Sequence, residues 1–377
     1  MDVLSRLRAI PLHVLAIGLL SFCTLAGILA LPDSLRLAAL GTLFASCAAT
    51  VLSQALLDRQ AGRKAVFSKT ALISGLIIGS ILPPDTLVGL VVLVGALAML
   101  LKRLIRIRGS PLFNPAALGL VSAGAAFGIR AGWWAAAPTP ALIGLQIASL
   151  VILGWKLGKF ILQAAFLLAW LAPWGVIIFL AGTAPPLSFF FGLIPFYLMA
   201  FMLLEPMTSP LKPSWQLVYG GFVALVAFAI PYANVPADAL LLALLAGNAL
   251  TKALALLPVP AEKAQNANIH AEGDEVVEIS IGKADLKPGE RRCVDAGGKK
   301  LALANINGKY CCIDNLCTHA GGPLCEGGLD KTGFGLVCPW HGSIFDMRNG
   351  KVIHGPAIEP VKFYALKEKG GELFIRL

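Results

Sequence analysis

Two short stretches decide how the C-terminal part of this chain folds: Cys317-Thr-His319-Ala-Gly-Gly-Pro-Leu and Cys338-Pro-Trp-His341-Gly-Ser-Ile-Phe-Asp. Each stretch supplies one cysteine and one histidine, and 18 residues separate His319 from Cys338. Two cysteines and two histidines are a donor set that a tetrahedral zinc site accepts. Zinc fingers, however, place both cysteines before both histidines. The alternating order here therefore favours a centre that is shared between two similar loops.

This order fits a cluster in which two thiolates bind one iron and two imidazoles bind the other. The residues around the four donors closely resemble the two cluster-binding loops of Rieske proteins. The resemblance implies an all-β domain that holds a [2Fe–2S] cluster. It also implies the ligands of that cluster: Cys317, His319, Cys338 and His341.

Details of the loops resemble the Rieske ferredoxins in particular. High-potential Rieske proteins carry an extra cysteine in each loop, where this chain has Gly322 and Trp340. They also pair a serine and a tyrosine with the cluster sulfurs, whereas here Phe345 replaces the tyrosine. Fewer hydrogen bonds to sulfur stabilise the reduced cluster less. The resemblance thus implies a low potential within the Rieske range of about −150 to +300 mV, with Pro339 and Ser343 beside the cluster.

Short runs of β-forming residues separated by glycine predict a small all-β domain over residues 275–377. The expected strands are Val276–Ile281, Leu301–Ile306, Lys309–Ile313, Gly335–Val337, Ser343–Asp346, Val361–Leu366 and Leu373–Leu377. Residues 258–274 are polar, lack an apolar period and are predicted to be a linker.

The N-terminal part has a different composition. The chain of 377 residues is 57% hydrophobic and only 14% charged, whereas soluble domains are about 45–50% apolar and about 25% charged. Apolar stretches close to the bilayer-spanning length of about 20 residues predict an all-α membrane domain of about ten transmembrane helices over residues 1–257. The expected spans are 10–31, 35–57, 70–82, 86–101, 112–129, 138–155, 160–181, 188–204, 216–231 and 238–257.

Charge predicts the orientation of these spans. The net charge is +10, and residues 1–260 hold 16 Lys and Arg against 6 Asp and Glu, while residues 261–377 hold 15 of each. The basic residues flank apolar runs, which argues against the exposed basic face of a nucleic-acid binder. With a cytoplasmic N-terminus, 14 of the 16 lie on one side and only Arg36 and Arg130 on the other. Because cytoplasmic loops are rich in Lys and Arg, we expect a multi-pass inner-membrane protein with both termini and the β domain in the cytoplasm.

The remaining cysteines are expected to be unbridged, because disulfides are rare in the cytoplasm. Cys311 and Cys312 are adjacent in a predicted strand, so their side chains should point to opposite faces. Cys23 and Cys47 lie in apolar spans and are expected to be packing residues.

Two parts of the apolar region show weak internal symmetry. Residues 74–115 and residues 199–251 each contain a short span that ends at proline, followed by a span with an asparagine near proline or glycine. Interrupted spans at matching positions favour inverted repeats with a ligand site at broken helices. The alternative is a bundle with ordinary kinks. Glu205 is an acidic residue within an apolar span, which makes it a candidate ion or proton site.

The segments Phe113-Asn-Pro-Ala-Ala-Leu-Gly, Leu204-Glu-Pro-Met-Thr-Ser-Pro and Gln216-Leu-Val-Tyr-Gly-Gly resemble the NqrB/RnfD family. Its members are the membrane flavoprotein subunits of sodium-pumping quinone reductase and of the Rnf complex. The resemblance implies a flavin near the broken helices, with these candidate binding residues: Thr139, Asn114, Pro115, Thr208, Ser209 and Asn248. Family members esterify FMN to a threonine that matches Thr139. Here the preceding Asp or Ser–Gly is absent and Pro138 stands where alanine is expected, so we expect non-covalent riboflavin or FMN.

Together these features predict an electron-transfer protein or oxidoreductase component. A cytoplasmic reductase or ferredoxin would supply electrons to the cluster, which would pass them to the flavin and on to a quinone or a redox protein on the far side. The alternative is a flavin or ion transporter with the β domain as redox sensor or gate. Oxygenase activity is disfavoured, because a mononuclear iron takes two histidines and a carboxylate, and the chain has only five histidines.

Overall fold

The computed structural model describes residues 7, 10–62, 67–107, 110–210, 213–233, 235, 237–256, 278–318, 321–330, 332–339, 342–354, 357 and 359–376. The chain divides near residue 255 into two compact units, a helical unit and a β unit. The predicted linker 258–274 lies outside the described residues. The fold class is as predicted: a helical N-terminal region and an all-β C-terminal domain.

Each predicted apolar stretch contains a helix. The main helices are α2 (Leu12–Ala30), α3 (Asp33–Gln60), α4 (Lys69–Ile81), α5 (Val88–Leu104), α6 (Pro115–Phe127), α7 (Pro140–Leu157), α8 (Phe160–Leu180), α9 (Leu187–Leu193), α10 (Pro213–Ala229) and α11 (Ala239–Leu256). Among the described residues, five helices are long and apolar enough to cross a membrane: α2, α3, α7, α8 and the α10 segment. The predicted count of about ten spans is therefore not confirmed, because helices such as α4 and α6 have only 13 residues each.

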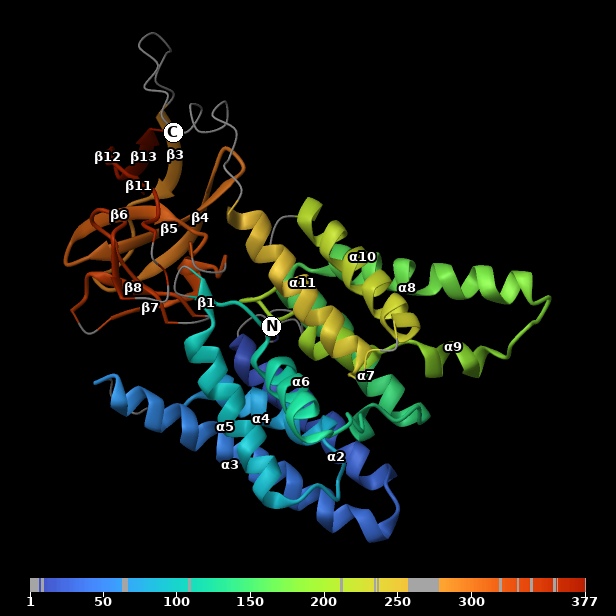
Figure 1. Cartoon of the computed structure of the whole chain (residues 1–377). Coiled ribbons are helices and arrows are strands. Elements are labelled where there is room, and N and C mark those ends of the chain that lie inside the picture. Colours follow the sequence, from blue (N-terminus) through green and yellow to red (C-terminus); the bar gives the residue numbers. More distant parts are fainter. Residues whose placement is uncertain are drawn as a thin grey trace. The chain divides into compact units, whose positions relative to one another are not determined.

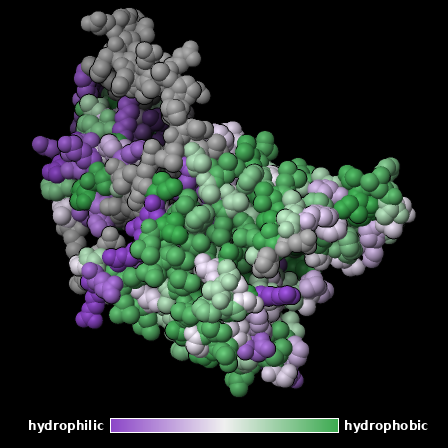
Figure 2. Space-filling view, in the orientation of Figure 1, coloured by the Kyte–Doolittle hydropathy of each residue, from purple (hydrophilic) through white to green (hydrophobic). Residues whose placement is uncertain are grey.

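The surface of the helical unit is apolar. Large hydrophobic side chains are exposed along α3 and α8, among them Phe44 (78%), Leu37 (80%) and Phe179 (83%). Figure 2 shows that hydrophobic residues dominate the visible face of this unit and that hydrophilic residues gather over the strands. Exposed apolar surface of this extent is typical of a surface that meets another apolar phase.

Small residues let the helices approach closely. α4 packs against α3, and α8 packs against α10 (Figure 1). A Cβ added at Gly75 of α4 would lie 2.6 Å from Cα of Cys47, and one at Gly79 would lie 2.9 Å from Cα of Leu43. Glycine is therefore required on this face of α4, as is common where helices pack inside membranes.

The predicted helix breaks are present. α4 ends at Ile81, just before Pro83 and Pro84, because the residue before a proline avoids the α conformation. Near the start of the second repeated segment, residues 199–251, α9 is followed by a π-helical turn, η2 (Leu198–Met202). Turns that begin at Leu203 and include Glu205 come next. Such π segments are frequent at functional sites.

The described residues of the β unit form three sheets. Their orders are β11-β6-β5-β4, β10-β9-β8-β7 and β12-β13-β3. The strands are β3 (Glu278–Lys283), β4 (Arg291–Ala296), β5 (Lys299–Ile306), β6 (Lys309–Asp314), β7 (Gly328–Leu329), β8 (Gly335–Val337), β9 (Ile344–Asp346), β10 (Val352–His354), β11 (Phe363–Tyr364), β12 (Leu366–Lys369) and β13 (Glu372–Arg376). The sequence pattern missed β4, β7 and β10, and of β12 it included only Leu366. β4 lies at a sheet edge and β7 has only two residues.

Two apolar cores lie on either side of strand β6. Cys311 packs in one core with Phe345 and Leu336, and Cys312 packs in the other with Tyr364 and Leu303. The prediction that the adjacent cysteines point to opposite faces is confirmed. Burial raises the pKa of the Cys312 thiol to about 12, which keeps this thiol protonated and unreactive.

One prediction about cysteine is wrong. Cys293 of β4 and Cys325 form a disulfide, with 5.1 Å between their Cα atoms. Cys325 belongs to the short 3₁₀ turn η4 (Leu324–Glu326), which packs against β4 and β5. The expectation came from the rarity of disulfides in the cytoplasm, which takes no account of the fold. The packing of η4 against β4 brings these two side chains within bonding distance.

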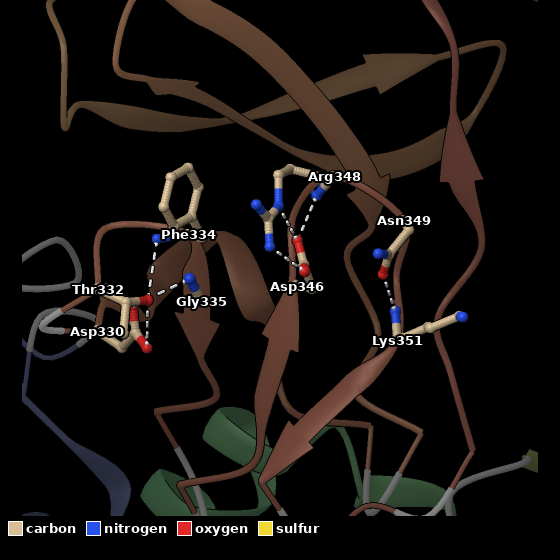
Figure 3. A network of polar contacts seen from close by, with 8 residues as sticks. All are labelled: Asp330, Thr332, Phe334, Gly335, Asp346, Arg348, Asn349 and Lys351. Carbon is tan, nitrogen blue, oxygen red and sulfur yellow. Dashed lines mark hydrogen bonds and ion pairs between the residues drawn. The ribbon is translucent and has the colours of Figure 1, made fainter.

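Aspartates fix the turns of the sheet that contains β8 and β9. Figure 3 shows Asp330 accepting hydrogen bonds from the Thr332 hydroxyl and from the N–H of Gly335, at 2.8 and 3.0 Å. Burial alone would raise the pKa of Asp330, but these hydrogen bonds hold it below its ordinary value.

Asp346 is the centre of the second group in Figure 3. Its carboxylate accepts hydrogen bonds from N, Nε and Nη2 of Arg348 at 2.9, 2.9 and 2.7 Å. The guanidinium also lies over the Phe334 ring, 4.2 Å from its centroid. The hydrogen bonds from Arg348 hold the pKa of Asp346 below its ordinary range.

We predict that replacing Cys293 and Cys325 by serine lowers the free energy of unfolding of the β unit by about 2–4 kcal/mol, which is the usual contribution of a disulfide to stability. Chemical denaturation of the full chain, followed by near-UV circular dichroism, would measure the loss. Wild-type protein treated with dithiothreitol should match the variant. Equal stability of variant and oxidised wild type would contradict the prediction.

A second prediction concerns pH. A carboxyl with a lowered folded pKa stabilises the fold above its unfolded pKa of about 3.9 and loses this effect as pH falls through the folded pKa. Arg348→Gln should therefore lower the denaturation midpoint at pH 7, with the difference from wild type vanishing at strongly acidic pH. Lys351→Gln removes the same charge from a side chain outside the Arg348–Asp346 ion pair and serves as the control. A difference that is independent of pH would argue against the ion pair.

Candidate functional site

The two cysteine loops of the β unit share one backbone geometry. In the first, the N–H of Cys317 donates to the carbonyl of Gly322, and the N–H of Gly321 donates to the carbonyl of Cys317, at 2.9 and 2.7 Å. In the second, the N–H of Cys338 donates to the carbonyl of Ser343 at 2.7 Å, and the N–H of Gly342 donates to the carbonyl of Cys338 at 3.0 Å. Both loops thus close between a cysteine and the residues four and five positions later.

A glycine makes each closure feasible. Gly321 and Gly342 have φ values of +72° and +75°, in the left-handed region that side chains other than glycine rarely adopt. Each follows its cysteine by four residues. These two glycines were not predicted as functional residues, although their matching spacing indicates that the loops are alike.

Both cysteine side chains are enclosed. Cys317 and Cys338 are each 2% exposed and contribute to the same core. The two histidines, His319 and His341, lie outside the described residues. Among the described residues no group of three or more His, Cys, Asp or Glu is arranged to hold a metal. Of the four proposed ligands, the structure therefore describes the two cysteines, and they come from matched loops. In a Rieske cluster two cysteine thiolates bind the same iron.

Neighbouring polar groups hold the loops in place. Asn315 is buried, and its side chain accepts from the N–H of Cys325 at 2.8 Å while its carbonyl accepts from Leu324 at 2.7 Å. The Ser343 hydroxyl is fully buried and accepts from the N–H of Ala357 at 2.9 Å. Asn315 is a positioning residue that the sequence analysis missed.

The predicted neighbours of the cluster have different environments. Pro339 follows Cys338 in a turn and is half-buried. Phe345, at the position of the expected tyrosine, is fully buried in the core and has no hydroxyl to offer. The role of Ser343 toward a cluster sulfur stays a prediction.

The helical unit contains a second polar site. Asn248 of α11 is fully buried, and its side-chain oxygen accepts from the N–H of Asn114 at 2.8 Å. Its amide nitrogen donates to the Tyr219 hydroxyl at 2.8 Å and to the carbonyl of Thr208 at 3.3 Å. Asn114 also caps α6, which begins at Pro115. Two interrupted regions that lie far apart in the sequence thus meet at one buried asparagine.

A lysine extends this polar site. Lys159 is 0% exposed, and its ammonium donates to the Ser209 hydroxyl at 2.5 Å and to the carbonyl of Leu204 at 3.2 Å. Glu205 accepts from the Thr208 hydroxyl at 3.0 Å. A buried charge needs such partners, because desolvation without them is costly. From the sequence, Lys159 was expected only to mark a cytoplasmic loop, and its hydrogen bond to Ser209 was not predicted.

Of the six predicted flavin residues, Thr139 lies apart from this network. Its hydroxyl accepts from the N–H of Leu142 at 3.4 Å and caps α7. The other five, Asn114, Pro115, Thr208, Ser209 and Asn248, belong to the polar site or begin the helix beside it.

Comparisons with known proteins concern the β unit. The family model described as Rieske [2Fe-2S] domain matches residues 279–365. The 3-phenylpropionate/cinnamic acid dioxygenase ferredoxin subunit of Shigella flexneri serotype 5b (strain 8401) is 32% identical over 94 residues, which are 25% of this chain and 87% of the relative. Apoptosis-inducing factor 3 of Homo sapiens is 31% identical over 93 residues, 24% of this chain and 15% of that protein.

Solved structures give a similar result. The ferredoxin of carbazole 1,9a-dioxygenase from Nocardioides aromaticivorans IC177 is 28% identical, with 26% of this chain and 97% of that chain covered and a TM-score of 0.26. Sphingomonas yanoikuyae B1 ferredoxin is 31% identical, with 27% and 99% covered and a TM-score of 0.26. These TM-scores are too low to support an argument on fold.

Two cysteines and two histidines could hold either a zinc ion or an iron–sulfur cluster. The match to the Rieske [2Fe-2S] family model supports the iron–sulfur cluster. The resemblance of residues 1–257 to the NqrB/RnfD family stays a prediction, because the family model covers only residues 279–365. A ferredoxin subunit matched over most of its length, together with two buried cysteines in matched loops, leads to one conclusion: through its C-terminal domain, this chain belongs to the Rieske [2Fe-2S] family.

Proposed function

We propose that this protein carries electrons from a cytoplasmic donor, through its Rieske cluster, to a flavin in the helical unit and on to a quinone or a far-side redox protein. When bound, the cluster supplies one-electron transfer. The observation that carries the proposal is the pair of matched loops, which bury Cys317 and Cys338 in the same core of a ferredoxin-like domain. A tethered redox domain acts at high effective concentration on its neighbour in the chain.

The proposed ligands are Cys317, His319, Cys338 and His341. The equal burial of the two cysteines and the equal closure of their loops support this assignment. Cys311 and Cys312 are poor alternatives, because their side chains pack into different cores on opposite sides of β6 and cannot bind one iron together. The disulfide leaves Cys293 and Cys325 without a free thiolate.

We propose that the helical unit spans the inner membrane with both termini and the β unit in the cytoplasm. Five helices of sufficient length and apolarity and an apolar outer surface support insertion in a membrane. Both termini lie on one side only if shorter apolar helices, such as α4, α6 and α11, bring the number of crossings to an even value. With the ten predicted spans, the distribution of Lys and Arg favours the cytoplasmic side.

The flavin, as riboflavin or FMN, is proposed to bind non-covalently near the polar site that contains Asn114, Thr208, Ser209 and Asn248. Support comes from the convergence of two interrupted segments there, because such breaks form ligand sites in membrane proteins. Thr139 is used as a helix cap, which agrees with a flavin that is not attached to it.

The donor is proposed to be a cytoplasmic reductase or ferredoxin. The matched 3-phenylpropionate/cinnamic acid dioxygenase ferredoxin subunit is a Rieske-type relative, so a partner that exchanges single electrons with a Rieske ferredoxin suits this domain.

A transporter with a redox-controlled gate is the second candidate. One observation favours it: the π-helical turn Leu198–Met202 leads directly to Glu205, whose neighbour Ser209 receives a hydrogen bond from the buried Lys159. A carboxylate and an ammonium near a helix break suit an ion or proton site.

We predict that Cys338→Ser abolishes the electron paramagnetic resonance signal of the reduced cluster, because an alcohol is a weak replacement for a thiolate ligand. Cys311→Ala, which changes a cysteine of the same core, should keep the signal. Circular dichroism confirms that both variants are folded. Full signal in Cys338→Ser, or its loss in folded Cys311→Ala, would reject the ligand assignment.

We also predict that the purified full chain contains flavin that acid denaturation releases, and that reducing the cluster bleaches this flavin in the same molecule. Asn248→Ala should lower the flavin content several-fold, whereas Thr139→Ala should leave it unchanged. Visible absorption and mass spectrometry measure both. Protein without flavin would rule out this form of the proposal, and flavin that is lost only in Thr139→Ala would relocate the site.

A further inference from the structure

A small polar hollow lies in the helical unit, where the C-terminal ends of α3 and α5 pack together. Its volume is about 110 Å³, and the described residues that line it are all polar or charged: Gln54, Asp58, Lys102, Arg103 and Arg106. Pockets for complete organic ligands usually measure about 300–1,000 Å³ and are mostly apolar. The hollow therefore suits one small polar group rather than a whole cofactor.

The lining of the hollow has an excess of positive charge. Three basic side chains and the carboxylate of Asp58 give it a net charge of +2. The carboxylate also accepts a hydrogen bond from the side-chain amide of Gln54 at 3.0 Å. A small anion in the hollow is thus attracted by more charges than repel it.

Two of the basic side chains are held in place and keep donors for a ligand. The Lys102 ammonium donates to the Thr70 hydroxyl at 3.3 Å, and the Arg103 guanidinium donates to the carbonyl of Leu57. Ammonium and guanidinium groups each carry several N–H donors, and within the described residues these are single hydrogen bonds. A phosphate group, with several charged acceptor oxygens, matches the donors that are left.

Exposed leucines lie on both helices in the turns before the hollow. Leu52 and Leu56 of α3 are 63% and 61% exposed, and Leu100 and Leu104 of α5 are 41% and 66% exposed. Arg103 follows Leu100 by three positions, so these two side chains share a face of α5. A ligand with its anionic head in the hollow would therefore find apolar surface beside it for acyl chains.

We propose that the hollow binds the phosphate of an anionic phospholipid, with Lys102 and Arg103 donating to its oxygens. The site rests on the proposed placement of the helical unit in a membrane and is independent of the cluster and the flavin. Both basic residues lie on the predicted cytoplasmic side, where anionic lipids give the membrane surface a negative potential and basic pockets between spanning helices bind lipid headgroups.

Native mass spectrometry of the purified full chain tests the site, with dioleoyl phosphatidylglycerol and dioleoyl phosphatidylcholine added in equal amounts. The two lipids share their acyl chains, but only phosphatidylglycerol has a net negative charge. Wild type should retain one phosphatidylglycerol in preference to phosphatidylcholine. Lys102→Gln and Arg103→Gln should each weaken this retention about tenfold or more, the usual effect of losing a charged hydrogen bond. Arg130→Gln removes an equal charge from an exposed position on the predicted far side and should behave as wild type does.

The possible outcomes separate the lipid site from the membrane placement. Equal retention of the two lipids by wild type, or an unchanged preference in the folded Lys102 and Arg103 variants, overturns the proposal. Inorganic phosphate that binds wild type as tightly as phosphatidylglycerol also overturns it, because the hollow is then a site for a free anion. Flotation of wild type with phosphatidylcholine vesicles tests membrane insertion by itself. A chain that floats without preferring phosphatidylglycerol loses only the lipid site, whereas a chain that does not float loses the membrane placement as well.

Discussion

The hydrogen bond from the backbone N–H of Asn114 to the side chain of Asn248 joins residues 134 positions apart in the sequence. A helix that starts or stops inside an apolar phase leaves backbone groups without partners, and no water is present to satisfy them. Asn248 solves this for two segments at once, because its oxygen serves the start of α6 and its nitrogen serves the carbonyl of Thr208. The contacts among Asn114, Thr208 and Tyr219 are arranged around this one amide.

Much of the architecture follows from local pattern. Apolar runs predicted the positions of the helices, and the order of cysteine and histidine predicted the cluster-binding loops. Asn114 and Asn248 lie in the two segments of the weak repeat, and the structure joins them by a hydrogen bond, while the ligand site expected there stays a prediction. The helical region and the all-β domain were predictable because both depend on residues close in sequence.

Other features depend on contacts that local pattern does not encode. Cys293 and Cys325 form a bond only because β4 and the η4 turn pack together. In the sequence, Lys159 is one of the basic residues that flank apolar runs, and no local pattern indicates that it is buried. Its burial depends on the turn after η2, where the carbonyl of Leu204 accepts its hydrogen bond. Thr139 was grouped with the asparagines by family resemblance, yet its hydroxyl serves its own helix.

The matched loops have a consequence for the energetics of electron transfer. Their closures are backbone hydrogen bonds between a cysteine and the residues that follow it, so loop closure and metal binding use different atoms of each cysteine. A cluster held by Cys317 and Cys338 would change its charge beside two cysteines that are only 2% exposed and held by these hydrogen bonds. Little nuclear rearrangement would then accompany each electron, and a small reorganisation energy is the property that allows a redox carrier to exchange electrons quickly with a weak driving force.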